Sequence, residues 1–151
     1  MKRHYTEDVF GVQLAGAHAN TLGACAELLT QKFDIDFIDL NCGCPIDLVC
    51  QDGAGSQLLA RKQRLESICK TMVDVMGDTP FTIKIRTGVL DKQPTAHTLI
   101  PNLQSWGVSA VTVCCFLFPL LYLQLLIVLP GISCTEDPRN KDTQNWRTSI
   151  T

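Results

Sequence analysis

Four short segments of the chain have the hydrophobic pattern of β-strands. Residues 81–87 are the clearest, because Phe81, Ile83 and Ile85 alternate strictly with polar residues. Successive side chains of a strand point to opposite faces, so this strand has one apolar face and one polar face. Shorter patterns predict three further strands at residues 9–15, 37–41 and 109–113.

Between these strands the apolar residues recur at helical spacing. The predicted helices cover residues 21–33, 61–76 and 95–106. Asn20 is expected to cap the first helix, Gly77 to end the second, and Pro101 to make the third irregular or to delay its start. The predicted buried face of the second helix comprises Leu65, Ile68, Cys69, Met72 and Met76. Strands that alternate with helices imply parallel βα units.

Polar side chains are expected near the carboxyl ends of three of the strands. Gln13, Asn41 and Lys84 all lie on the polar side of their strands. In a parallel barrel, one strand face meets the covering helices and the other lines the interior, and active sites lie at the carboxyl ends. Two amides and a cation in this place predict a site for a flat, polar ligand. A structural alternative for Lys84 is an ion pair with Asp39 inside the barrel.

The run at residues 39–45 (DLNCGCP) ends one strand and begins a turn. Pro45 fixes its own φ and restricts the backbone of Cys44, so the thiol is held just past the strand end. A second turn, with Gly53 and Gly55, is expected to open a short helix at residues 57–59. Taken alone, a cysteine in such a turn is more often a small buried apolar residue than a catalytic one.

These motifs together resemble the signature of the tRNA-dihydrouridine synthases. The resemblance rests on Asn41-x-Gly-Cys-Pro, on Gly53-x-Gly55 with Leu58 and Leu59 downstream, and on the runs at residues 11–16 and 82–88, in the family's order. The sequence of residues 41–47 is most similar to that of a eukaryotic branch that reduces uridine in the variable-loop region of tRNA. The resemblance extends from the N-terminus to about Val113.

The resemblance implies an FMN enzyme on a TIM (β/α)8 barrel, followed in the family by a helical domain that helps to hold tRNA. NADPH reduces the flavin, a hydride passes to C6 of a uridine flipped out of the RNA, and a cysteine donates the proton to C5. Cys44 matches that proton donor. An ordinary thiol is protonated at neutral pH, so placement is its main requirement. The residues that match the flavin and uracil contacts are Gln13, Asn41, Lys84 and Arg86.

The sequence departs from the family after residue 113. The family's His-Gly-Arg is replaced by Cys114, Cys115 and Phe116, and about four of the eight strands are present. The expected fold is therefore α/β, a partial TIM barrel at residues 1–113 with exposed sheet edges and an unrelated tail at residues 114–151. A catalytically inactive truncated product is the alternative function, and another flavin barrel that reduces free pyrimidines is a third.

The tail begins with an apolar run at residues 111–129, close to the ~20 residues that span a bilayer. The run has no flanking basic residues, which favours an alternative exon or intron as its origin over a membrane anchor. Residues 133–151 are polar and are expected to be disordered.

Composition limits the number of domains, the class of partner and the cellular compartment. The 151 residues allow one domain of ordinary size, and the net charge of −2, from 13 basic and 15 acidic residues, gives no electrostatic footprint for nucleic acid. No signal-peptide core is visible, so the eight cysteines are expected to be reduced, in the cytosol or nucleus. The spacing of Cys42, Cys44 and Cys50 is not a paired Cys-x-x-Cys pattern, and no metal site is predicted.

Overall fold

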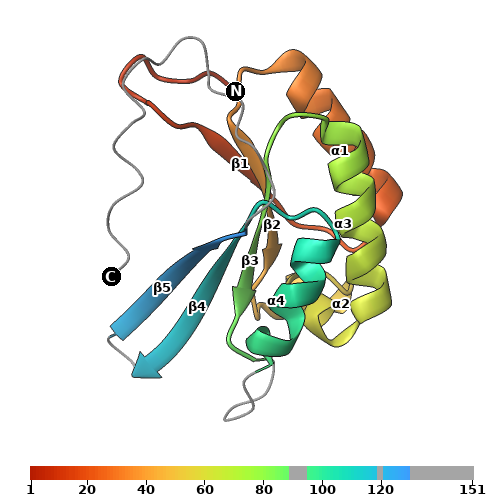
Figure 1. Cartoon of the computed structure of the whole chain (residues 1–151), viewed down its shortest axis with the longest axis vertical. Coiled ribbons are helices and arrows are strands. Elements are labelled where there is room, and N and C mark those ends of the chain that lie inside the picture. The colour runs from red at the N-terminus through yellow and green to blue at the C-terminus, as the bar shows by residue number, and fades with distance from the viewer. Residues whose placement is uncertain (89–94, 119–120, 130–151) are drawn as a thin grey trace.

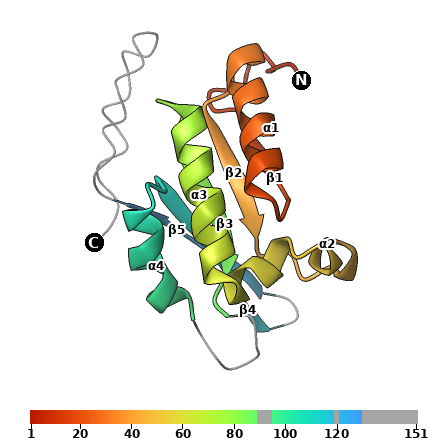
Figure 2. The same cartoon turned by 90° about the vertical axis from the view of Figure 1, so that its right-hand side faces the viewer.

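One five-stranded sheet organises the described part of the chain, with helices on one of its faces (Figures 1 and 2). The structure is a computed structural model that describes residues 1–88, 95–118 and 121–129. Its elements are β1 (Gly11–Leu14), α1 (Ala19–Lys32), β2 (Phe37–Cys42), α2 (Asp47–Gln51), the 3-10 helix η1 (Gly55–Ala60), α3 (Lys62–Met76), β3 (Phe81–Arg86), α4 (Ala96–Ser105), β4 (Ala110–Phe118) and β5 (Leu121–Val128).

The strands lie in the sheet in the order in which they occur in the sequence. Strands β1 to β4 pair in parallel, and β5 pairs with β4 in antiparallel fashion. Figure 2 shows α1, α3 and α4 standing in front of the sheet, as the connecting helices of βα units do. Parallel strands in sequence order, with every crossover helix on the same face, form the beginning of a (β/α)8 barrel. The predicted partial barrel is confirmed, and its four expected strands are all present.

The apolar run at residues 111–129 forms most of a β-hairpin. The first part of the run lies in β4, and the second part forms β5. The sequence pattern did not predict β5. The two strands pair from Ala110 opposite Val128 to Phe118 opposite Leu121. Strand β4 therefore crosses the expected domain boundary at Val113 without a break. The expectation of disorder at residues 133–151 lies outside the described residues.

Within the described residues, no helix has the length and apolar character needed to cross a membrane.

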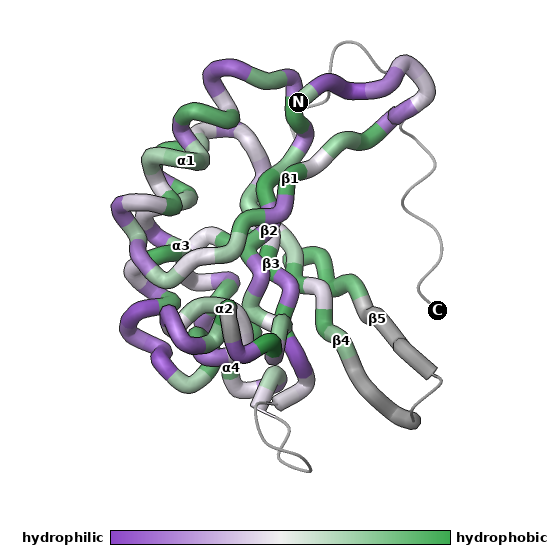
Figure 3. Tube along the Cα trace, turned by 180° about the vertical axis from the view of Figure 1, so that it is seen from behind, coloured by the Kyte–Doolittle hydropathy of each residue, from purple (hydrophilic) through white to green (hydrophobic). Residues whose placement is uncertain are grey.

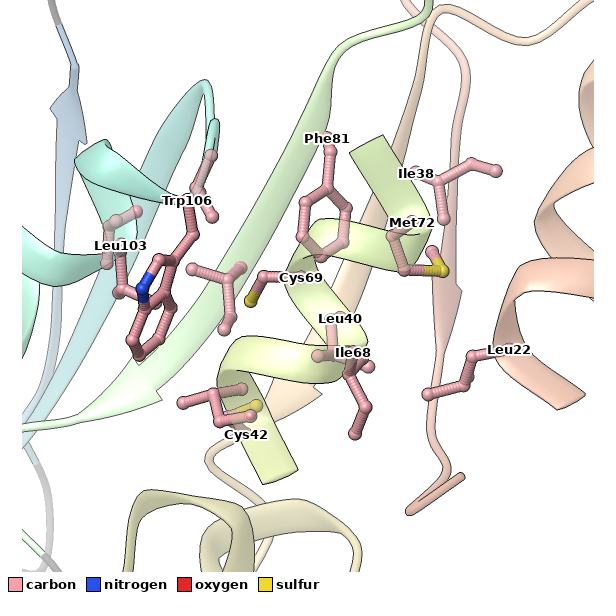
Figure 4. Close-up of a cluster of buried hydrophobic side chains, with 14 of the residues drawn as sticks. Leu22, Ile38, Leu40, Cys42, Ile68, Cys69, Met72, Phe81, Leu103 and Trp106 are labelled. Atoms are coloured by element: carbon pink, nitrogen blue, oxygen red, sulfur yellow. The ribbon is translucent and has the colours of Figure 1, made fainter. Parts of the chain in front are cut away.

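The hydrophobic core lies between the helices and one face of the sheet. Figure 3 shows hydrophilic and hydrophobic stretches alternating along α1 and α3, as expected for helices with one buried side. The predicted buried face of α3 is confirmed in full, from Leu65 to Met76. The alternation in β3 is confirmed as well, because Phe81, Ile83 and Ile85 are all buried. Figure 4 shows Phe81 among the buried side chains of the core. This packing fixes which side chains of each strand face the helices and which face the barrel interior.

The start of α1 differs from the expectation, and two further details of the helices are new. Helix α1 begins at Ala19 rather than at residue 21, and its N-cap is His18, which makes no side-chain capping bond. The predicted cap at Asn20 was wrong because the helix start depends on a backbone bond from Leu22 N–H to the His18 carbonyl. The short helix α2 was not predicted. Pro101 lies inside α4, and the helix continues through it.

Candidate active site at the carboxyl ends of the strands

The strand register places the predicted side chains together on the face of the sheet opposite the helices. Asn41 on β2 lies opposite Lys84 on β3, and Gln13 on β1 lies opposite Asp39, one row nearer the amino ends of the strands. The parallel pairing aligns the carboxyl ends of all three strands. Side chains that lie far apart in the sequence therefore form one polar surface, as expected.

Asn41 connects this surface to the turn that carries Cys44. Its side-chain oxygen accepts hydrogen bonds from the backbone N–H of Gly43, at 3.1 Å, and of Cys44, at 3.0 Å. Its Nδ2 donates in turn to Oε1 of Gln13, at 3.0 Å. Two amides and the backbone of the Cys44 turn therefore belong to one hydrogen-bonded set.

The same set continues into the sheet through Asp39. Gln13 Nε2 donates to one oxygen of the Asp39 carboxylate at 2.7 Å, and Thr82 Oγ1 donates to the other at 2.8 Å. Asp39 is buried, with 8% of its surface exposed. The sequence pattern places Asp39 and Asn41 on one strand face, but it does not reveal the bonds of Asp39 to Gln13 and Thr82.

The glycine turn at residues 53–55 packs directly under Cys44. Gly55 has φ +58°, and a Cβ at this position would lie 2.6 Å from the carbonyl oxygen of Cys44. That oxygen accepts a hydrogen bond from the Ser56 N–H at 2.9 Å and from the Cys50 thiol at 3.5 Å. The close approach requires glycine at residue 55. The Cys44 turn is thus held from both sides, by Asn41 and by the glycine turn.

The two predicted cations lie along β3 on the same face. Lys84 and Arg86 are half-buried, and both interact with neighbouring groups of the protein. Lys84 lies beside Asn41 in the register, whereas Arg86 lies one row further along, opposite Cys114 of β4. Gly43 passes over this strand, with its Cβ position 3.6 Å from Cγ of Arg86. The Arg86 side chain therefore borders the Cys44 turn, whereas Lys84 contributes its backbone carbonyl there, 3.7 Å from the same Cβ position, and lines the inner cavity.

A cavity of about 640 Å3 runs along the open inner face of the sheet. Its polar lining includes Gln13, Asp39, Thr82, Lys84 and Thr112. Its apolar lining includes Val9, Phe37, Pro80, Ala110, Leu126 and Val128. In a closed barrel such side chains fill the interior, so the apolar part is barrel core. Of the predicted site residues, Gln13 and Lys84 line this cavity. Asn41, Cys44 and Arg86 do not line it and lie beyond it, towards the carboxyl ends of the strands.

The buried thiols differ from Cys44 in their surroundings. Cys42 on β2 and Cys69 on α3 lie in the core between helix and sheet (Figure 4). Burial raises the pKa of Cys42 well above its ordinary value, and the neighbouring Cys69 and Asp39 raise it further. Burial also raises the pKa of Cys69 to about 12. Such thiols stay protonated and unreactive, whereas Cys44 is half-exposed in its turn.

In the part of the chain that the structure describes, no three His, Cys, Asp or Glu side chains are grouped so that they could hold a metal ion.

Comparison with known proteins identifies the family to which the chain belongs. The sequence profile described as dihydrouridine synthase (Dus) matches residues 1–146. A tRNA-dihydrouridine(47) synthase (NAD(P)(+))-like protein of Xenopus laevis is 55% identical over 112 residues, which are 74% of this chain and 17% of that protein. The proteins of the same name from Homo sapiens and Oryza sativa subsp. japonica are 49% identical over 112 residues and 41% identical over 113 residues.

These alignments cover 74% and 75% of this chain, and 17% and 16% of the human and rice proteins. The chain thus spans under a fifth of the length of the curated relatives named here. The profile match of residues 1–146 covers almost the whole chain, including the polar strand ends, the Cys44 turn and the glycine turn. The chain therefore belongs to the dihydrouridine synthase family.

Proposed function

We propose that this chain takes part in the FMN-dependent reduction of uridine to 5,6-dihydrouridine in tRNA, with NADPH as the reductant. The observation that carries the proposal is the hydrogen-bonded set that joins Gln13 and Asn41 to the turn of Cys44. It puts a half-exposed thiol beside two fixed amides at the carboxyl ends of parallel strands, which is where barrel enzymes hold their substrates. Family membership and the names of the relatives support the same reaction.

The residues present suit a flavin ring. Gln13 and Asn41 offer amide groups, and Lys84 and Arg86 offer positive charge, along the edge of one polar surface. A flat heteroaromatic ring with carbonyl oxygens and ring nitrogens matches this donor set. When bound and reduced by NADPH, FMN would supply the hydride that adds to C6 of the uracil ring.

Cys44 would complete the reduction by giving its thiol proton to C5. The C5–C6 double bond then gains one hydride and one proton, and the thiolate left behind regains a proton from solvent. The turn contributes placement: Pro45 restricts the backbone, Asn41 holds two of its N–H groups, and Gly55 supports its carbonyl. Fixed geometry matters because the thiol must meet one carbon of a ring that is already held.

The substrate base has to leave the RNA stack to reach such a site. The chain's net charge of −2 provides little general attraction for RNA, so most of the phosphate contacts would have to come from other parts of a complete synthase. We place the reaction in the cytosol or nucleus.

A test uses the purified chain with FMN, NADPH and unmodified tRNA, and measures dihydrouridine by mass spectrometry of the digested RNA. Product is expected with the natural sequence and with Cys25→Ala, a control in a half-buried cysteine of α1. Cys44→Ala should reduce the rate by about 100-fold or more, because a positioned general acid contributes roughly that factor. Equal rates for Cys44→Ala and Cys25→Ala would contradict the role of Cys44. Turnover of free uridine or orotate in preference to tRNA would point to a different pyrimidine reductase.

A further inference from the structure

We infer that Asp39 is a positioning residue, which sets the orientation of Gln13 and Asn41 and through them the position of the Cys44 turn. The catalytic meaning of this role rests on the proposed function, but the role itself is a property of the folded chain. The path runs from Asp39 to Gln13 at 2.7 Å, from Gln13 to Asn41 at 3.0 Å, and from Asn41 to the N–H of Cys44 at 3.0 Å.

The two ends of this path fix the direction of every bond in it. Backbone N–H groups can only donate, so the Asn41 atom that faces Gly43 and Cys44 must be its oxygen. The Asn41 nitrogen then faces Gln13, whose oxygen must receive it. The nitrogen of Gln13 is left for the other end, where the Asp39 carboxylate can only accept. The donors and acceptors at the two ends therefore allow only one orientation of each amide.

Asp39 is the residue that makes the arrangement stable at its buried end. An ionised carboxylate accepts hydrogen bonds more strongly than a neutral group does. A second donor, Thr82, holds the other oxygen from β3 at 2.8 Å, so the carboxylate joins β1, β2 and β3. If Asp39 were apolar, Gln13 would lose the acceptor that selects its orientation. A flipped Gln13 would present its nitrogen to the Asn41 nitrogen, so Asn41 would keep its two bonds to the Cys44 turn but lose the acceptor that holds its other end.

The hydrogen bonds of Asn41 also limit which ligand atoms it can bind. Both lone pairs of the Asn41 oxygen are used by the turn, and one of its two N–H groups is used by Gln13. Asn41 can therefore offer a ligand one N–H donor and no acceptor. The ligand atom next to Asn41 must be an acceptor, such as a carbonyl oxygen or an unprotonated ring nitrogen.

Hydrogen exchange of the backbone amides tests the positioning role without flavin or RNA. Asp39→Leu keeps a similar shape and removes both acceptors. It should raise the exchange rates of the Gly43 and Cys44 amides by about tenfold relative to the amide of Ile83 in the core strand. A purely structural role would instead raise all three rates together. Ile83 thus serves as an internal reference for global stability.

Asp39→Asn is the conservative control. Its oxygen can still accept from Gln13, and its nitrogen can donate to Thr82, whose hydroxyl is free to reverse. Exchange at Gly43 and Cys44 should then stay within about twofold of the natural chain. If Asp39→Asn released the turn as strongly as Asp39→Leu does, charge rather than orientation would be the cause, and the inference would be wrong.

Gln13→Leu breaks the same path at an exposed residue of the edge strand, and so provides a test if Asp39→Leu does not fold. It should release the Gly43 and Cys44 amides as well. In a variant that carries both Asp39→Leu and Gln13→Leu, the increases in amide exchange rate should not add, because either substitution alone interrupts the same hydrogen-bonded path. Additive effects, or protected amides in Gln13→Leu, would overturn the inference. Failure of the tRNA assay would leave this measurement unaffected, so the two proposals are tested separately.

Discussion

The contact between the glycine turn and the cysteine turn gives the sharpest structural prediction. Gly55→Ala places a Cβ 2.6 Å from the carbonyl oxygen of Cys44, on a residue with φ +58°. A real Cβ does not approach backbone so closely, so the two turns must separate. The oxygen would then lose its hydrogen bond from the Ser56 N–H, now 2.9 Å long.

The cost can be estimated from these two effects. An alanine in the left-handed region loses about 1–2 kcal/mol, and one broken hydrogen bond loses about 1 kcal/mol. The expected fall in the free energy of unfolding is therefore about 2–3 kcal/mol. For a chain of this length that corresponds to a Tm lower by roughly 5–10 °C.

Gly77→Ala is the matched control. Gly77 has a nearly identical φ of +57°, and no atom lies within 4 Å of its Cβ position. It therefore carries a backbone cost without the contact with Cys44. The assay combines thermal unfolding with the rate at which iodoacetamide alkylates Cys44, read peptide by peptide by mass spectrometry. Gly55→Ala should change that alkylation rate and Gly77→Ala should not. An unchanged rate in both variants would refute the packing of the glycine turn on Cys44.

Three further predictions concern the core, the edge strand and the buried thiols. Ile83→Ala should lower the free energy of unfolding by about 2–5 kcal/mol in denaturant titrations, because Ile83 is fully buried; a loss below about 1 kcal/mol would contradict its place in the core. Gly11→Ala should lower the free energy of unfolding, because its Cβ would lie 2.1 Å from the tip of the Phe37 ring and the ring would have to move. The double variant with Phe37→Leu should recover much of the lost stability, and no recovery would show that the ring is not the obstacle. The free energy of unfolding should also fall as pH rises above the ordinary thiol pKa of ~8.5, because the pKa of Cys69 is raised to about 12 only in the folded state. The stabilisation from this protonated thiol is complete below the unfolded-state pKa and is lost on the way to the folded-state pKa. Cys69→Ala should reduce this slope, with the remainder coming from Cys42, whose pKa burial also raises, and an unchanged slope would count against the burial of the Cys69 thiol.

The regular part of the fold was predictable because burial imposes a period on the sequence. The alternation at residues 81–87 and the apolar stripe from Leu65 to Met76 follow from one strand face and one helix face meeting in the core. The carboxyl-end site followed from the same patterns, since the faces of β1, β2 and β3 determined which polar residues point inward.

The parts that were missed depend on contacts that no local pattern encodes. The start of α1 depends on a backbone hydrogen bond to His18, with no side-chain cap to mark it. Strand β5 lies in a run whose continuous apolar character has no strand period, and only pairing with β4 defines it. The role of Asp39 required the register, which sets Gln13 and Thr82 on either side of its carboxylate.

We have proposed that the polar strand ends and the Cys44 turn form a flavin site within this chain. The most direct measurement is the visible absorption spectrum of the purified chain, mixed with FMN and then desalted, beside the Lys84→Gln variant. We expect a retained flavin band in the natural chain and a weaker one in Lys84→Gln, because Lys84 lies opposite Asn41 on the polar surface. A desalted natural chain without a flavin band, or equal bands in the two proteins, would contradict it.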